Sequence, residues 1–201
     1  MNILLGVLFV LWIYVISLLV RAKLHFFKFL VGSVGMFFFM MIFLQPYLVG
    51  ILSKAVTAVA GIIGNSTGYY EAYYQYALIL ITKGSVNISM YIDYECSGVI
   101  EILAFTALLW FFPLYTTLEK VMYNIAGVAW IFMANTLRIF IICALVHAFG
   151  NNMYYFAHTI FGRIVFYVLS IILYFYVFTK SQIKSQKVGN VSYGNDARQN
   201  L

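Results

Sequence analysis

Long apolar runs separated by short polar connections dominate the hydrophobic pattern of this chain. Runs with enough apolar residues for a ~30 Å hydrocarbon core lie at about residues 2–20, 29–44, 98–112, 123–148 and 157–179. The pattern predicts an all-α integral membrane protein, a bundle of about five transmembrane helices. The run at 98–112 gives a helix of only ~22 Å. We therefore expect either that this helix continues through Pro113 or that its outer end is sunk below the membrane surface.

The polar connections predict how the helices are oriented. The segment "RAKLHFFK" after the first run and the lysines after the last run are basic, and cytoplasmic loops of membrane proteins are enriched in Lys and Arg. This places the amino terminus outside and the carboxyl terminus in the cytoplasm of a multi-pass cell-membrane protein. We expect one transmembrane domain over residues 1–180, with an external insert at about 45–95, and a polar, disordered cytoplasmic tail over 181–201.

The external insert has two parts with different patterns. Residues 47–63 carry small and apolar side chains at helical spacing, with Lys54 as their only charge, which favours an interfacial or re-entrant helix. A sixth full span is the alternative for this segment. The stretch "YALILITKGSVNISMYIDY" predicts a β-hairpin with Lys83 and Gly84 at its turn, because β-branched residues alternate in its second arm. These parts would form a small extracytoplasmic cap.

Composition narrows the class of protein further. With 64% hydrophobic and 9% charged residues, the chain cannot cover a soluble globular surface. Its net charge of +6 comes from basic residues beside apolar segments, so it indicates topology rather than a nucleic-acid partner. No Cys/His spacing is typical of a metal site and no glycine-rich phosphate loop is present, so we expect neither a metal nor a cofactor.

The first stretch with reactive chemistry is "DYECSGVIEILAF". It places Cys96 at the outer mouth of the third helix, with Ser97 or Gly98 as the helix cap. The positive end of the helix dipole should lower the pKa of this thiol and favour the thiolate; the alternative is a small buried residue. The other cysteine, Cys143, lies within the apolar "FIICALV" and should be inert packing without a disulfide to Cys96.

The second stretch, "MANTLRIFIICALVHAFG", puts Arg138 inside an apolar helix. An arginine at membrane depth costs at least ~2.5 kcal/mol, so it should be paired or face a wet cavity. Asn135 lies on the same helical face. A structural ion pair with Glu101, which is also a possible partner of Arg163, is the alternative and is compatible with Glu101 orienting the guanidinium. His147 projects from the opposite side of the helix and should be dispensable.

The third stretch, "YYFAHTIFGRIVF", places His158 at the start of the last helix, at the outer level of Cys96. Gly162 follows one helical turn later, which leaves room beside the imidazole for a neighbouring helix or a substrate strand. Arg163 lies on another face, where it could snorkel to the surface or join the site. A lone histidine at a helix mouth is usually a solvated cap, so the interest lies in three such residues on successive helices.

The segments "ECSGV", "NTLRI" and "AHTIFGR" resemble the three signature blocks of the exosortase/archaeosortase family, in the right order over roughly residues 90–170. The chain is similar to the compact members seen in Gram-positive bacteria. The resemblance implies a multi-spanning enzyme, proposed to be a cysteine transpeptidase, that processes a sorting signal. It implies Cys96 as nucleophile with Arg138 and His158 as its catalytic partners. The expected partners are a substrate protein with a transmembrane sorting signal and membrane lipid.

Reaction chemistry agrees with these roles. A thiolate attacks a carbonyl, the guanidinium of Arg138 can stabilise the oxyanion, and His158 can move the proton. A thioacyl enzyme would form on Cys96, to be resolved by an amine, a hydroxyl or water. The residues leave the acceptor, the substrate and the oligomeric state open. The alternative is a non-enzymatic carrier or assembly subunit with a polar intramembrane pocket, which would tolerate replacement of Cys96.

Overall fold

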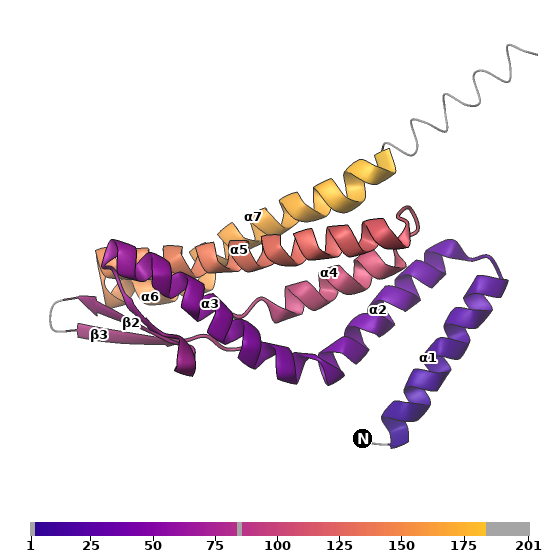
Figure 1. The fold of residues 1–201 in the computed structure, drawn as a ribbon, viewed down its shortest axis with the longest axis horizontal. Coiled ribbons are helices and arrows are strands. Elements are labelled where there is room, and N and C mark those ends of the chain that lie inside the picture. Colours follow the sequence, from indigo (N-terminus) through magenta and orange to yellow (C-terminus); the bar gives the residue numbers. More distant parts are fainter. Residues whose placement is uncertain (1–2, 84–85, 184–201) are drawn as a thin grey trace, which may run out of the picture.

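The computed structural model describes residues 3–83 and 86–183. Its helices form one elongated bundle that carries a small β-sheet at one end (Figure 1). The main helices are α1 (Ile3–Arg21), α2 (His25–Phe43), α3 (Gln45–Thr67), α4 (Val99–Phe111) and α5 (Thr117–Phe149). The last helical segment consists of η2 (Asn151–Met153), α6 (Tyr154–Phe156), η3 (Ala157–Phe161), α7 (Gly162–Tyr174) and η4 (Phe175–Thr179).

Five helices in the described part of the chain are long and apolar enough to cross a membrane: α1, α2, α3, α5 and the continuous run Asn151–Ile183. The chain is therefore a multi-pass integral membrane protein, as predicted. The number of spanning helices agrees with the prediction, but one of the five segments is a different one. The predicted span at 98–112 is the 13-residue α4, about 20 Å long. The segment predicted as interfacial or re-entrant is the 23-residue α3, which meets the length and hydropathy criteria of the alternative, a full span.

The connection between α4 and α5 explains why α4 is short. The helix ends at Phe111, and Phe112 already has an extended backbone (φ −66°, ψ 126°), as expected of a residue that precedes proline. The next helix starts with a capping box: Thr116 Oγ1 accepts a hydrogen bond from Glu119 N, and the Glu119 carboxylate accepts one from Thr116 N. The helix does not continue through Pro113, and its other end is buried, with Val99 0% exposed.

The sheet is antiparallel with the order β1–β2–β3, formed by Glu71–Tyr73, Leu78–Lys83 and Val86–Tyr91. The predicted hairpin is present as β2 and β3, paired from Leu78↔Tyr91 to Lys83↔Val86. Its predicted turn residue Gly84 lies outside the described residues, as do positions 184–201 of the predicted tail. The first strand was not predicted, because three residues are too few for an alternating pattern.

Two apolar clusters hold these layers together. The first packs the buried face of the sheet against α3 and α5, with Ile79, Ile81, Met90, Val56 and Ile142 in its centre. The second joins α4, α5 and α7 through residues such as Phe105, Ile131 and Phe166. We call the end of the bundle with the sheet the sheet end. The other end, which carries Arg21, Lys23, Lys28 and Lys120, is the basic end.

Candidate active site

A tight turn after β3 presents Cys96 to the bundle. The Asp93 carboxylate oxygen Oδ1 accepts hydrogen bonds from Glu95 N (3.0 Å) and Cys96 N (3.2 Å), and Asp93 O also accepts from Cys96 N. An aspartate that bonds backbone amides two and three residues ahead is a common way to fix a turn. These hydrogen bonds fix the backbone just before Cys96, and Cys96 itself is only 2% exposed.

Ser97 and Gly98 connect this turn to α4. Gly98 is the N-cap residue, with φ +76° in the left-handed region that favours glycine, and Ser97 Oγ donates to Tyr94 O at 3.0 Å. Of the two predicted caps, Gly98 is therefore the one used. Cys96 precedes the cap by two residues, so it lies outside the first helical turn, where the helix dipole acts most strongly.

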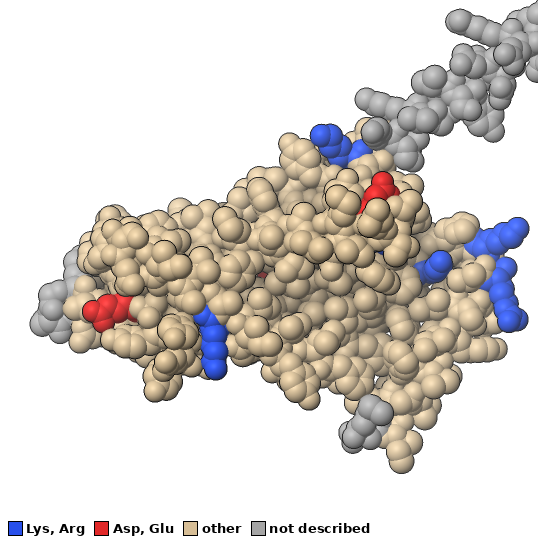
Figure 2. All heavy atoms as spheres, viewed as in Figure 1, with Lys and Arg blue, Asp and Glu red and all other residues tan. Residues whose placement is uncertain are grey.

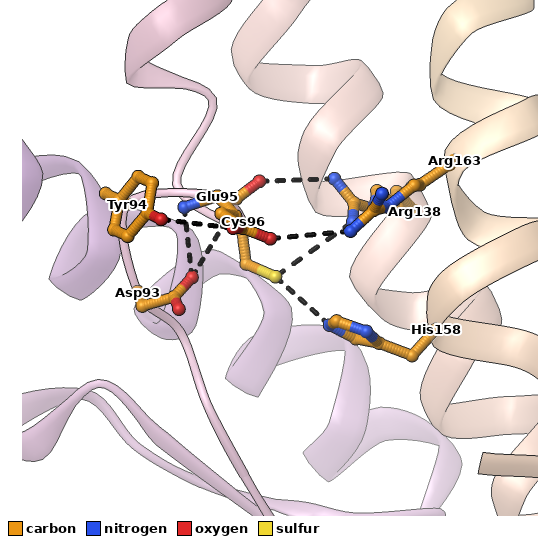
Figure 3. Close-up of polar contacts among 7 residues, drawn as sticks. All are labelled: Asp93, Tyr94, Glu95, Cys96, Arg138, His158 and Arg163. Atoms are coloured by element: carbon orange, nitrogen blue, oxygen red, sulfur yellow. Dashed lines mark hydrogen bonds and ion pairs between the residues drawn. The ribbon is translucent and has the colours of Figure 1, made fainter. Parts of the chain in front are cut away.

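Two residues of α5, Asn135 and Arg138, contact the cysteine and its turn from the bundle side; Figure 3 shows Arg138 beside the Cys96 sulfur. The Asn135 amide Nδ2 donates to Cys96 O at 2.6 Å. The Arg138 guanidinium donates from Nη1 to Glu95 O at 3.4 Å and places Nη2 4.0 Å from Cys96 Sγ. Both side chains are buried, and Asn135 Oδ1 and Arg138 Nε find no hydrogen-bond partner among the described residues. The guanidinium also lies 5.9 Å from the centre of the Phe166 ring, a cation–π distance.

His158 completes the contact on the other side of the sulfur. Its Nε2 lies 3.2 Å from Cys96 Sγ, and its ring stacks on Tyr154 with centroids 5.7 Å apart. The histidine is in η3, a five-residue π-helical turn, an irregularity that occurs often at functional sites. The structure thus brings Cys96, Arg138 and His158 together from a loop, α5 and the last helical segment.

The position of the cluster along the bundle follows from the lengths of the helices. Arg138 lies 11 residues before the end of α5 at Phe149, which places it about 16 Å along the helix axis from that end. The Cys96 sulfur lies beside the Arg138 guanidinium. The end of α4 at Phe111 excludes continuation through Pro113, and the depth of Cys96 below the membrane surface stays a prediction.

Burial raises the pKa of the Cys96 thiol to about 11, although the nearby Arg138 charge lowers it and the carboxylates of Asp93 and Glu95 raise it further. The expectation of a lowered pKa is therefore wrong. Its physical reason is that removing the sulfur from water disfavours the thiolate more than the guanidinium favours it. The neutral thiol is the resting form of Cys96 at neutral pH.

The supporting residues lie partly where the sequence predicted. Glu101 forms no ion pair with Arg138 or Arg163 in the described part of the chain; Arg163 instead pairs with Glu95, Nη2 to Oε2 at 3.4 Å, in an exposed position. The alternative of a structural Glu101–Arg138 ion pair is thus not seen among these residues, where backbone and sulfur acceptors hold Arg138. Gly162 allows close packing of the last helix, since a Cβ there would lie 2.8 Å from Ile142 Cδ1.

In the described part of the chain, the side-chain partners of Cys96 Sγ are His158 and Arg138 rather than Cys143 or His147. Cys143 and Cys96 are both buried free thiols, and both belong to the first apolar cluster. His147 stacks on Tyr69 with ring centroids 4.9 Å apart, near the end of α3. Among the described residues, no group of three His, Cys, Asp or Glu side chains could hold a metal ion.

Sequence reasoning missed three residues that shape the site. Asp93 fixes the turn, Glu95 binds both arginines, by its carbonyl and its carboxylate, and Tyr154 stacks on the imidazole. The turn could have been predicted from Asp93, because an aspartate commonly fixes a turn by bonding backbone amides a few residues ahead. The contact of Tyr154 could also have been predicted, since this residue precedes His158 by four residues and so shares its helical face.

A comparison with protein families gives an independent result. The model of the transmembrane exosortase family matches residues 1–176, a range that includes every residue of the cluster around the sulfur. No match was found among curated proteins or among solved structures. The match covers most of the chain, including the amino-terminal third in which no signature block was recognised. The chain therefore belongs to the transmembrane exosortase family.

Proposed function

We propose that this protein is a membrane-embedded cysteine transpeptidase or protease that cleaves a sorting signal of an exported or membrane-anchored protein on the extracytoplasmic side. The observation that carries the proposal is the contact of one thiol with an imidazole and a guanidinium, at 3.2 Å and 4.0 Å from Cys96 Sγ. A nucleophile within reach of a base is the arrangement that activates cysteine for attack on a carbonyl. Membership in the exosortase family supports the same reaction class.

Activation requires transfer of the thiol proton. Because the pKa of Cys96 is raised to about 11, few thiolates exist at neutral pH before substrate binds. His158 Nε2, in the tautomer that carries its proton on Nδ1, accepts the thiol proton as sulfur attacks the scissile carbonyl. The imidazolium that forms then donates this proton to the leaving amine.

Arg138 is suited to stabilise the negative charge that develops on the carbonyl oxygen. Its guanidinium donates to Glu95 O and lies beside the sulfur, and its Nε has no hydrogen-bond partner within the described part of the chain. A carbonyl carbon bonded to Sγ would place its oxygen within reach of these donors. Preorganised donors in a buried site stabilise an oxyanion more than water does, so Arg138 should act mainly on the transition state.

Two half-reactions complete the proposed cycle. In the first, a C–S bond forms, the scissile C–N bond breaks and the amine leaves with the proton from His158. In the second, an amine, a hydroxyl or water attacks the thioester, the C–S bond breaks and the proton passes through His158 back to Cys96. An amine or hydroxyl acceptor makes the enzyme a transpeptidase or acyltransferase, and water makes it a protease.

The charge distribution supports an extracytoplasmic site. Lys and Arg side chains gather at the end of the molecule where α1 and α2 are joined (Figure 2), and basic loops of membrane proteins are retained in the cytoplasm. The Cys96 cluster is close to the sheet end of the bundle, which is opposite the basic end. The exposed Glu95–Arg163 pair borders it and marks the side from which a substrate segment would approach.

The proposal is tested by the processing of membrane proteins in cells. Proteins whose carboxyl-terminal segment persists when this gene is deleted are the substrates, and each variant is expressed at equal membrane abundance. Cys96→Ala should leave them unprocessed, whereas Cys143→Ala, which removes the other thiol, should process them at close to the wild-type rate. Wild-type processing by Cys96→Ala would contradict the cysteine mechanism and favour the carrier alternative.

A further inference from the structure

A polar cavity lies at the basic end, far from the Cys96 cluster. It has a volume of about 380 Å³ and lies between the start of α2, the end of α4 and the start of α5. Three residues that can carry positive charge line it: His25 and Lys28 from α2, and Lys120 from α5. No aspartate or glutamate lines it, so its electrostatic character is that of an anion site.

The two lysines lack carboxylate partners in the described part of the chain, where the one ion pair is Arg163–Glu95. The ammonium of Lys120 donates one hydrogen bond to Trp110 O at 2.6 Å, at the carboxyl end of α4. This bond orients the ammonium and leaves its other donors free. Lys28 acts on Lys120 as a repulsive like charge. An anion between them would convert that repulsion into two attractions.

The Glu119 carboxylate, the nearest acidic neighbour in sequence, does not fill this role. Its Oε2 accepts hydrogen bonds from both Thr116 N (2.8 Å) and Thr116 Oγ1 (2.9 Å) as part of the helix cap. This acceptor is therefore committed to the start of α5. Among the described residues, no carboxylate forms an ion pair with the lysines of the cavity.

The surroundings of the cavity identify the source of the anion. Trp110 lines it and is 44% exposed, and tryptophan at a helix end is typical of the membrane–water interface. Phe111 and Phe112 also line it, so an apolar wall adjoins the charged groups. Basic pockets between helices at the cytoplasmic side are suited to anionic headgroups. We propose that this cavity binds the phosphate group of an anionic phospholipid.

The site has a structural consequence for the bundle. Lipid phosphate bound by Lys28 and Lys120 would link α2 to α5 around the end of α4. Since the other end of α4 leads to Gly98 and Cys96, the lipid would help to fix the depth of this short helix. The inference does not depend on the reaction proposed for Cys96.

The test compares lipids on the full chain in detergent, by native mass spectrometry and thermal unfolding. Phosphatidylglycerol should be retained and should raise the unfolding temperature above that in phosphatidylcholine, with inorganic phosphate at the same concentration having a smaller effect. Lys28→Gln combined with Lys120→Gln should weaken phosphatidylglycerol retention by roughly 5-fold per lysine. The matched control, Arg21→Gln combined with Lys23→Gln, removes two charges from the same end outside the cavity and should retain it.

Three results would overturn the proposal. Equal retention of the two lipids by the wild-type chain would exclude an anionic site. Equal loss in the control and cavity variants would assign the effect to diffuse surface charge. Equal stabilisation by inorganic phosphate would reject a lipid as the source. If the double variant does not fold, Lys28→Gln alone should show the roughly 5-fold loss, and unchanged retention would overturn the site.

Discussion

The ionisation of Cys96 gives a prediction that depends on the geometry of the site rather than on a known substrate. Burial raises the pKa of this thiol from 9.0 to about 11. A difference of this size corresponds to about 100-fold fewer thiolates at neutral pH, or roughly 2.7 kcal/mol. Ionisation of Cys96 is disfavoured because the thiolate loses more hydration free energy on burial than the Arg138 charge restores.

The assay is alkylation of the Cys143→Ala protein, in which Cys96 is the only thiol. Deprotonation increases with pH, so the logarithm of the alkylation rate should rise in proportion to pH from 8 to 10 and should level off only near the pKa of about 11. The comparison uses the shape of this profile, because steric access changes the absolute rate but not the midpoint.

Charge variants test the cause of the raised pKa. Arg138→Gln removes the charge that favours the thiolate and should move the midpoint higher, whereas Asp93→Asn removes a charge that disfavours it and should move the midpoint lower. A plateau below pH 9 in the Cys143→Ala protein would refute the reasoning. Such a plateau would show that the protein already stabilises the thiolate, which is the effect expected of the helix dipole.

Three further variants test the catalytic arginine, the helix packing and the surface pair. Arg138→Lys keeps the charge but loses the planar fork, so processing should fall by at least about 100-fold; wild-type processing would reject the oxyanion role. Gly162→Ala puts a Cβ 2.8 Å from an α5 side chain and should destabilise the detergent-solubilised protein by about 1–3 kcal/mol, unlike Gly50→Ala, whose Cβ meets no atom within 4 Å. Arg163→Gln breaks an exposed pair with Glu95, so the unfolding free energy should change by less than about 1 kcal/mol.

Hydropathy was sufficient to predict the helical bundle, because a membrane segment needs a long apolar run and the five strongest runs are plain in the sequence. It could not predict which segments are full-length spans. The 13-residue α4 ends early because Phe112 precedes Pro113, and α3 exceeds its predicted length at both ends. The alternation in β3 was sufficient for the hairpin, whereas β1 pairs only through contacts with β2.

At the site, helical periodicity placed Asn135 and Arg138 on one face of α5, and both side chains contact the turn that holds Cys96. The partners of charged residues were not predictable, because they depend on distances across the bundle. Arg138 binds the backbone of the Cys96 turn, and the alternative ion pair with Glu101 is not formed in the described part of the chain. The pKa of Cys96 had the opposite sign to the prediction, since the extent of burial cannot be read from a local motif.

The most direct test of the proposed mechanism is detection of the thioacyl enzyme. Cells that express the Cys143→Ala protein should contain a fraction in which Cys96 carries the amino-terminal part of a cleaved substrate, joined by a bond that hydroxylamine releases. Mass spectrometry of the isolated membrane protein should locate this adduct on the Cys96 peptide, and the adduct should be absent from Cys96→Ala. Continued processing of substrate without any adduct on Cys96, or with the acyl group on another residue, would contradict the account.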